Sequence, residues 1–239
     1  MAIFLKAKWQ NIIMANYVVE PEILMPYLPK GTDLDLYNNK AYVSLVGFLF
    51  KETKLFNIPI PWLGTFEEIN LRFYVVRKEG NMIKRGVVFI NETIPYKAVA
   101  WMANKLYKEH YTTVPTRHVW KIEPELKNIL YEWKINNEWN QIEVQAINKS
   151  EPMTEGSLES FIFEHYNGYT KINDGATEEY KIKHPSWKTN KVIHTNINCD
   201  FNKMYGAPFA HLSKLAPDSV YIAEGSAIEI EWKRKRLNL

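Results

Sequence analysis

Several residue types that mark common protein classes are nearly absent from this sequence. Cys199 is the only cysteine among 239 residues, so no disulfide can form within one chain. This favours a reducing compartment over a secreted, disulfide-stabilised scaffold. The start of the chain, Met1 to Lys8, lacks a long apolar segment and a small-residue cleavage site. No stretch approaches the ~18 uninterrupted apolar residues of a transmembrane helix. We therefore expect a cytoplasmic protein with no membrane contact.

Glycine is also scarce, with ten residues, and the glycine-dependent motifs are missing. The sequence has no P-loop, no dinucleotide-binding glycine triplet and no Gly-x-Ser-x-Gly nucleophile elbow. None of the six histidines has the spacing of a His-Glu-x-x-His or His-x-His metal site. We therefore expect no cofactor and no metal centre. Cys199 lies near His194, but a buried, unreactive thiol is favoured over a catalytic one.

Charge of one sign does not dominate the chain. The formal net charge is +3, from 30 Lys and Arg against 27 Asp and Glu, and the two signs are mixed along the sequence. This argues against a nucleic-acid partner. One dense basic run occupies residues 233–236. A contact with phosphate or a membrane is one interpretation, and a solvated tail is the favoured one.

Aromatic side chains and strand signals are what the sequence has in quantity. Aromatic residues make up 14 %, including eight Trp and fourteen Tyr. Period-two or β-branched patterns, bounded by turn residues, predict strands over 41–51, 66–77, 85–92, 127–134, 139–147 and 227–232. Helical spacing and capping residues predict short helices over 20–28, 96–109, 157–166 and 200–205. With no repeat and no linker, the pattern indicates one α+β, β-rich domain over residues 1–239.

One group of polar residues stands out on the strand predicted over 66–77. Period-two alternation places Glu68, Asn70 and Arg72 on the same face of that strand. Arginine is scarce, with six residues against 24 lysines, so its place beside a carboxylate calls for an explanation. Arg72 is suited to hold a substrate carboxylate, with Glu68 as general acid or base. The alternative is an internal ion pair between Glu68 and Arg72, which the spacing alone favours.

Four segments in order resemble the YqjF-like bacterial family, a domain of unknown function (2071). Residues 66–75 resemble its F-x-E-x-N-x-R-x-Y-V signature, and His184-Pro185-Ser186-Trp187 resembles its H-x-P-W-like turn. The family's N-terminal strand–helix–Leu-Pro segment matches at Tyr17, Pro21, Leu24, Leu28, Pro29 and Asp35. Its F-L-x-E-R-Y-x-x-Y segment matches at Phe161, Glu164, His165, Tyr166 and Tyr169. His165 stands where that family usually has an arginine.

The family is distantly similar to acetoacetate decarboxylase, and this similarity implies a fold. The implied structure is a cone-shaped, mostly antiparallel β-barrel with a few short helices and an internal small-molecule pocket. Glu68 then matches a pocket glutamate of the decarboxylase. The resemblance also draws His184 and Trp187 into the set of expected substrate-binding residues.

The departures from the decarboxylase pattern concern its chemistry. The decarboxylase forms a Schiff base through the first of two adjacent lysines, and Tyr111 and Thr112 fall at those two positions here. A tyrosine cannot form an imine, and the lysine mechanism needs a neighbouring ammonium group to lower the pKa of the reacting amine. Gln10 stands in place of a pocket arginine and Val46 in place of a second glutamate.

Three functions follow as hypotheses. The first is an enzyme that acts on a small oxo acid or carbonyl compound without a Schiff-base lysine. Glu68 and Tyr111 would be its acid/base pair, and Arg72, Asn70, Gln10, His184 and Trp187 would bind substrate. The second is a non-catalytic binding protein with an aromatic-lined pocket. The third is the Schiff-base decarboxylase, which requires Lys105 or Lys108 to reach the pocket. The sequence leaves a homo-oligomer open.

Overall fold

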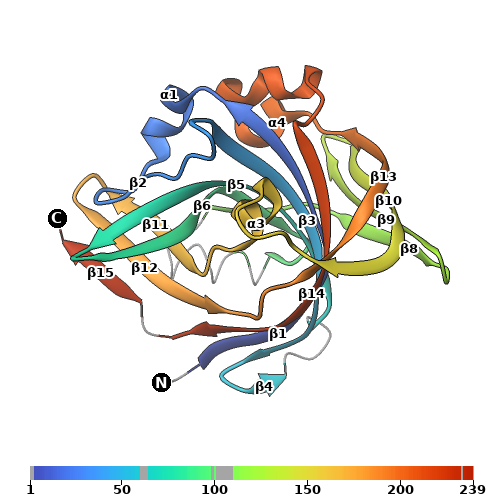
Figure 1. Ribbon diagram of the computed structural model, residues 1–239, viewed down its shortest axis with the longest axis horizontal. Helices are drawn as coiled ribbons and strands as arrows, with labels where there is room; N and C mark the ends of the chain where they lie inside the picture. The colour runs from blue at the N-terminus through green and yellow to red at the C-terminus, as the bar shows by residue number, and fades with distance from the viewer. Residues whose placement is uncertain (1–2, 60–63, 98–99, 101–109, 233, 239) are drawn as a thin grey trace.

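The computed structural model describes residues 3–59, 64–97, 100, 110–232 and 234–238 of the chain (Figure 1). Long, strongly bent strands form one continuous sheet, in which the N-terminal half supplies β1 (Ile3–Val19), β2 (Asp33–Leu34), β3 (Ala41–Leu55), β4 (Ile58–Pro59), β5 (Phe66–Glu79), β6 (Met82–Ile94) and β7 (Tyr111–Thr113). The C-terminal half supplies β8 (Thr116–Ile122), β9 (Leu126–Ile135), β10 (Glu138–Pro152), β11 (Asn167–Asn173), β12 (Ala176–Lys183), β13 (Lys188–Asn198), β14 (Ser219–Glu231) and β15 (Lys235–Asn238).

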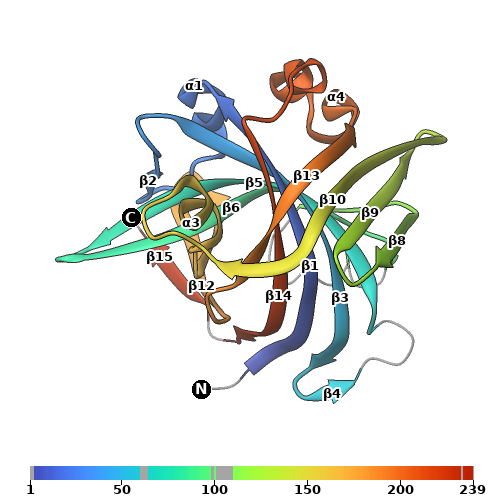
Figure 2. The ribbon, with the colours of Figure 1, turned by 45° about the vertical axis from the view of Figure 1, so that its right-hand side comes forward.

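The sheet closes on itself because β14 changes partner along its length. Near its start β14 pairs with β13, and near its end Ile230 and Glu229 pair with Ile182 and Lys183 of β12. The strands β14, β1, β3, β5, β6, β11 and β12 thereby form a ring, which Figures 1 and 2 show from two sides. Neighbours in this ring are antiparallel except β6 and β11. The predicted strand-rich, mostly antiparallel α+β fold is confirmed.

The strands β13, β10, β9 and β8 form an outer layer that branches from β14, while β2, β4, β7 and β15 are short strands that pair with members of the ring. Side chains of β9 and β10 pack on the outer faces of β1, β3 and β5 in one dry hydrophobic core. The layers approach closely at Gly47, where an added Cβ would lie 3.0 Å from Ile142 and 3.1 Å from Tyr131. A second core fills the interior of the ring. The strands β1, β3 and β5 are thus buried on both faces.

Short helices cover the ends of the ring. They are α1 (Pro21–Leu24), η1 (Met25–Tyr27), α3 (Leu158–Phe163), α4 (Phe201–Tyr205) and η2 (Ala207–Lys214). Ser157 caps α3 by accepting a hydrogen bond from the backbone of Ser160, and Asp200 caps α4 in the same way. Phe161, Ile162 and Phe163 of α3 pack among the interior side chains of the ring. The helix therefore fills part of the interior and leaves the rest for a cavity.

Most elements expected from the sequence are present with shifted ends. The two strands flanking Asn136 and Asn137 form the predicted hairpin, in which both asparagines adopt positive φ. Three predicted helices, over 20–28, 157–166 and 200–205, are shorter than expected. Most of the helix expected over 96–109 lies outside the described residues. The strands β2, β4, β7, β8, β11, β12, β13 and β15 were not predicted, and a strand at β1 was expected only from the resemblance to the family.

The basic run at the C-terminus is not the solvated tail that the sequence favoured. Residues 235–238 form β15, which pairs with β12 so that Arg236 lies opposite Glu178 and Lys235 opposite Glu179. The guanidinium of Arg234 lies 4.3 Å above the ring of Tyr180. Lys235 pairs with Glu79 and Arg234 lies 3.8 Å from Glu178, while the side chains of Lys235 and Arg236 stay exposed.

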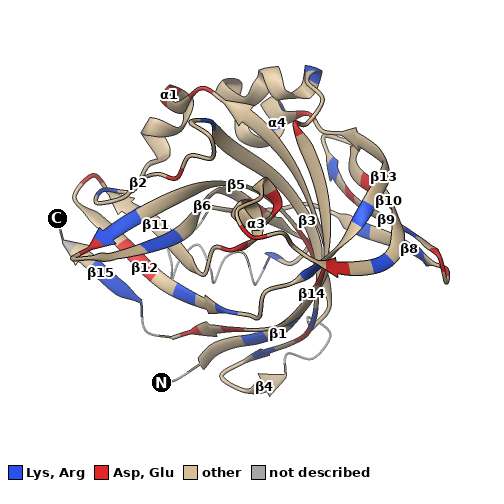
Figure 3. Ribbon diagram, in the orientation of Figure 1, with Lys and Arg blue, Asp and Glu red and all other residues tan. Residues whose placement is uncertain are grey.

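Lysine and arginine are interspersed with aspartate and glutamate over the fold (Figure 3). Many of these charges pair across strands, as Lys84 does with Glu179 at 2.9 Å and Lys183 with Glu231 at 2.8 Å. Within the described part of the chain, no helix is long and apolar enough to cross a membrane.

Candidate functional site

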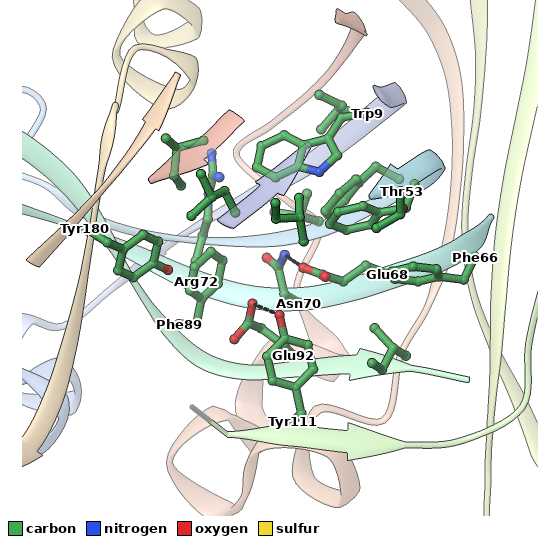
Figure 4. Close-up of a pocket in the computed structure, with 18 of the residues that line it drawn as sticks. Trp9, Thr53, Phe66, Glu68, Asn70, Arg72, Phe89, Glu92, Tyr111 and Tyr180 are labelled. Carbon is green, nitrogen blue, oxygen red and sulfur yellow. Dashed lines mark hydrogen bonds between the residues drawn. The ribbon is translucent and has the colours of Figure 1, made fainter. Parts of the chain in front are cut away.

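A cavity of about 110 Å³ lies inside the ring, on the interior face of β5. Figure 4 shows the side chains around it, which come from β1, β3, β5, β6, β7 and β12, strands that are far apart in the sequence. Most of the lining is apolar, and a few polar groups converge on it, as is usual for a small-molecule site.

Aromatic rings form one wall of the cavity. Phe50 and Phe66 are stacked with centroids 4.7 Å apart, and Trp9 meets Phe48 edge to face at 5.1 Å. These rings come from β1, β3 and β5, whose alternation points every second side chain into the ring. The aromatic excess of the sequence is thus used partly in this wall, where it provides a rigid apolar surface for a ligand.

Two buried carboxylates line the cavity. Glu68 is 4 % exposed and accepts a hydrogen bond from Asn70 Nδ2 at 3.0 Å. Glu92 on β6 is 3 % exposed and accepts a hydrogen bond from the hydroxyl of Tyr111 at 2.8 Å. Short parallel pairing of β7 with β6 sets Tyr111 beside Glu92, and Asn70 is the cross-strand partner of Glu92. Figure 4 shows both hydrogen bonds at the centre of the site.

Glu92 is the site residue that sequence reasoning missed. It lies at the end of the strand predicted over 85–92, so the strand itself was expected. A register shift between β5 and β6 separates the pairs Leu71–Asn91 and Arg72–Phe89. Simple alternation along the sequence therefore does not reveal which side chains of β6 face the ring interior.

Arg72 does not form the ion pair that its spacing from Glu68 favoured. Its Nη2 donates to the carbonyl oxygen of Ile162 at the end of α3, at 3.2 Å, and lies 3.3 Å from Met14 Sδ. It has no carboxylate partner among the described residues. The guanidinium therefore lines the cavity with its charge offset only by neutral groups, which suits it to bind an anion.

The other expected site residues divide into two groups. Trp187 lines the cavity, and its indole N–H donates to Ser226 Oγ at 2.8 Å. His184 stacks on Trp187 with ring centroids 4.0 Å apart, but it is not among the residues that line this cavity. Gln10 does not line it either, whereas Val46 does. The structure thus brings Glu68, Asn70, Arg72, Tyr111 and Trp187 together and leaves Gln10 and His184 apart.

Four buried polar atoms of the cavity side chains have no hydrogen-bond partner within the described part of the chain. They are Trp9 Nε1, Thr53 Oγ1, Asn70 Oδ1 and Arg72 Nε. Buried polar groups in proteins are nearly always hydrogen-bonded, and leaving one unpaired costs about 1–3 kcal/mol. Unpaired buried polar atoms also occur elsewhere in the described chain, but those of Trp9, Thr53, Asn70 and Arg72 belong to side chains that line one cavity.

No lysine is among the described residues that line the cavity. Lys105 and Lys108, the candidates for a Schiff base, lie outside the described residues. Lys127 is buried on β9 in the outer layer, donates to Asn190 Oδ1 at 2.6 Å and does not line the cavity. Burial lowers its pKa to about 8.

Other reactive groups of the described chain lie away from the cavity. Cys199 is buried, and burial raises the pKa of its thiol, so it is unreactive, as the sequence indicated. In the described ranges, no three His, Cys, Asp or Glu side chains cluster as metal ligands do.

Solved structures with the same fold are acetoacetate decarboxylases and related enzymes. The decarboxylase of Legionella pneumophila aligns with 99 % of this chain and 88 % of its own, at 10 % identity and a TM-score of 0.64. An acetoacetate decarboxylase-like enzyme of Sphingomonas wittichii RW1 aligns with 100 % and 94 %, at 8 % identity and 0.65. The enduracididine biosynthesis enzyme MppR, complexed with pyruvate, aligns with 99 % and 91 %, at 10 % and 0.64. These likenesses show the fold alone.

Sequence comparison gives the family. The uncharacterized protein YqjF of Bacillus subtilis (strain 168) is 31 % identical over 88 residues, which are 36 % of this chain. The chain thus spans about a third of that relative's length, 35 %. The family model for DUF2071, an uncharacterized conserved protein, matches residues 6–227. Because that match takes in nearly the whole ring and outer layer, the chain belongs to the DUF2071 family.

Proposed function

We propose that the ring cavity binds a small carboxylic acid with a carbonyl group, a 2-oxo acid, and catalyses proton transfer at the carbon next to the carbonyl. The observation that carries this proposal is the position of Arg72. A guanidinium without a carboxylate partner lines the same cavity as Glu68, Glu92 and Tyr111. MppR, which shares the fold, has been solved in complex with pyruvate, an acid of this class.

Each polar group has a role in this proposal. Arg72 holds the carboxylate of the substrate by charge-assisted hydrogen bonds. Glu68 takes a proton from the carbon next to the carbonyl, so the electron pair of the C–H bond moves into a carbon–carbon double bond. Without substrate, the single hydrogen of the Tyr111 hydroxyl is donated to Glu92; with substrate bound, the hydroxyl turns this hydrogen to the carbonyl oxygen as negative charge develops there. The reverse steps return a proton to the carbon and restore the 2-oxo acid.

A lysine imine is not needed for this chemistry. Two carboxylates and a tyrosine line the cavity, and no lysine is among its described lining residues, which supports a mechanism without an imine. Reduction with borohydride in the presence of pyruvate is therefore expected to leave the protein mass unchanged. An adduct at Lys105 or Lys108 would restore the Schiff-base decarboxylase and overturn the present proposal.

The aromatic wall favours a second candidate, a binding protein without catalysis. Trp9, Phe48, Phe50 and Phe66 offer far more apolar contact than a three-carbon acid requires. In this case larger acids would raise the melting temperature of the protein, and none would react.

Loss of the methyl proton signal of pyruvate in deuterated water, followed by NMR, separates the two candidates. We expect the protein to accelerate the exchange and the Glu68→Gln variant to lose about 10²–10⁴-fold of that acceleration. Glu67→Gln is the matched control, because Glu67 lies next in sequence but on the outer face of β5. Binding without exchange would support the binding protein. Full activity in Glu68→Gln would remove Glu68 from the mechanism.

A further inference from the structure

The unpaired polar atoms of the cavity differ in what they require from a ligand. The indole N–H of Trp9 and the Nε–H of Arg72 can only donate a hydrogen bond. The amide oxygen of Asn70 can only accept one, and the Thr53 hydroxyl can do either. A ligand that satisfies this set brings acceptors and also at least one donor.

The orientation of Asn70 is fixed by its neighbour. Its Nδ2 donates to Glu68 Oε1 at 3.0 Å, and a carboxylate accepts hydrogen bonds but does not donate them. The opposite orientation would set two acceptors against each other. Asn70 Oδ1 is therefore the free atom, on a side chain that is 2 % exposed and lines the cavity. Figure 4 shows Asn70 between Arg72 and Glu68, with Trp9 above it in this view.

A simple carboxylic acid or 2-oxo acid can pair only with hydrogen-bond donors, which are the N–H groups of Trp9 and Arg72 and the hydroxyl of Thr53. Its carboxylate and carbonyl oxygens accept from Arg72 and Trp9, but the molecule has no hydrogen to offer Asn70. An ammonium group would supply donors to Asn70 and Thr53, yet it cannot accept from Trp9. It would also add a second positive charge to the cavity that Arg72 lines. A hydroxyl group does both, which makes it the substituent that fits this mixed set.

We infer that the preferred ligand is a hydroxy acid. Its carboxylate contacts Arg72, its hydroxyl donates to Asn70 Oδ1, and the indole N–H of Trp9 donates to one of its oxygens. This inference rests on the proposed function and refines it, because it assigns Asn70 and Trp9 as specificity-determining residues. A hydroxylated 2-oxo acid, or the enol formed from a 2-oxo acid, carries the same donor.

Four three-carbon acids that differ only at the second carbon test this inference. Lactate carries a hydroxyl there, alanine an ammonium, pyruvate a carbonyl oxygen and propanoate only hydrogen. The phenyl-substituted members of the same series add an aromatic ring for the wall of the cavity. Calorimetric titration of the full chain is expected to show at least tenfold tighter binding of the hydroxy acid than of its deoxy counterpart.

Variants test which protein atoms cause the preference for the hydroxy acid. Asn70→Leu is expected to reduce the preference for the hydroxy acid to about onefold, because no acceptor remains. Trp9→Phe keeps the aromatic ring but removes the N–H donor, so we expect about fivefold weaker binding of the acids. Trp133→Phe is the matched control: the indole N–H of Trp133 is also buried and unpaired, but it lies in the outer core. If Asn70→Leu does not fold, the affinities of the wild type for the four acids and those of Trp9→Phe still test the inference.

The outcomes separate the two proposals. If none of the acids binds, the proposed function fails and the inference fails with it. If the acids bind but lactate and propanoate have equal affinities, the hydroxy-acid inference is overturned while the proposed function stands. Tightest binding of alanine would identify an ammonium as the donor and would also overturn it.

Discussion

Glu67 and Glu68 are adjacent in sequence and both buried, but they lie on opposite faces of β5. On the outer face, Glu67 accepts a hydrogen bond from Thr116 Oγ1 at 2.6 Å and lies 2.5 Å from His118 Nδ1. On the inner face, Glu68 lies with Asn70 and Arg72 around a cavity in which several polar atoms are unpaired. The outer carboxylate joins β5 to β8, and its hydrogen bonds are made within the protein.

The comparison contrasts a buried carboxylate whose partners are side chains of β8 with one that lines a cavity. The outer face continues with Ile69, Leu71 and Phe73, all fully buried in the dry core between ring and outer layer. Unpaired polar atoms occur in both cores, but on the inner face those of Asn70 and Arg72 lie beside a cavity. A protein tolerates the cost of such a site when a ligand offsets it, which is why unsatisfied polar groups are expected at functional sites.

The largest effect on stability is expected on the outer face. Leu71→Ala removes a fully buried side chain and should lower the free energy of unfolding by about 2–5 kcal/mol, measured by urea denaturation. The affinity of the folded variant for acids should remain that of the wild type. A folded Leu71→Ala variant with at least tenfold weaker binding would contradict the separation of the two faces.

We expect His165 to make the stability of the fold depend on pH. Its ring packs on Tyr74, which follows Arg72 on the inner face of β5. Burial lowers the pKa of His165 to about 4, although Asp35 raises it by a hydrogen bond. Between pH 6.5 and 4 the unfolded chain binds a proton that the folded chain does not, so stability falls as the pH drops, by on the order of 3 kcal/mol. His165→Gln should flatten this part of the pH–stability curve. An unchanged slope would show that another group titrates there.

A smaller effect on stability is expected for Glu67, the carboxylate on the outer face of β5. Burial raises the pKa of Glu67, but hydrogen bonds from His118 and Thr116 outweigh this and hold it below its usual value of 4.5. Its contribution is therefore present at neutral pH and is lost as the pH falls below about 4.5. Glu67→Gln should cost about 1–2 kcal/mol at pH 7 and less in acid, as urea denaturation at several pH values would show. Equal losses at pH 7 and pH 3 would contradict this account.

The sequence predicted the interior face of β5 well because it depends on local alternation. Glu68, Asn70 and Arg72 do share one face, as a period of two requires. What local spacing cannot show is the distant partner of Arg72. Ile162 lies 90 residues away, and the carbonyl at the end of α3 binds Arg72 in place of the expected pairing with Glu68.

The strands that local patterns missed share a physical cause. β1 is buried on both faces for most of its length and carries a register shift near Asn11, which has positive φ, so its pattern is not a simple alternation. The charged strand β15 exists because Glu178 and Glu179 lie opposite it on β12. Such complementarity is visible only after the chain has folded.

The central claim is that the inner face of β5 binds a small carboxylic acid through Arg72, and calorimetric titration with pyruvate tests it most directly. Arg72→Met keeps the length of the side chain and removes the charge. Arg117→Met is the control, because Arg117 pairs with Glu132 on the outer layer. We predict saturable binding by the wild type and by Arg117→Met, and at least tenfold weaker binding by Arg72→Met. Equal affinities of the wild type and Arg72→Met, or no binding by the wild type, would contradict the account.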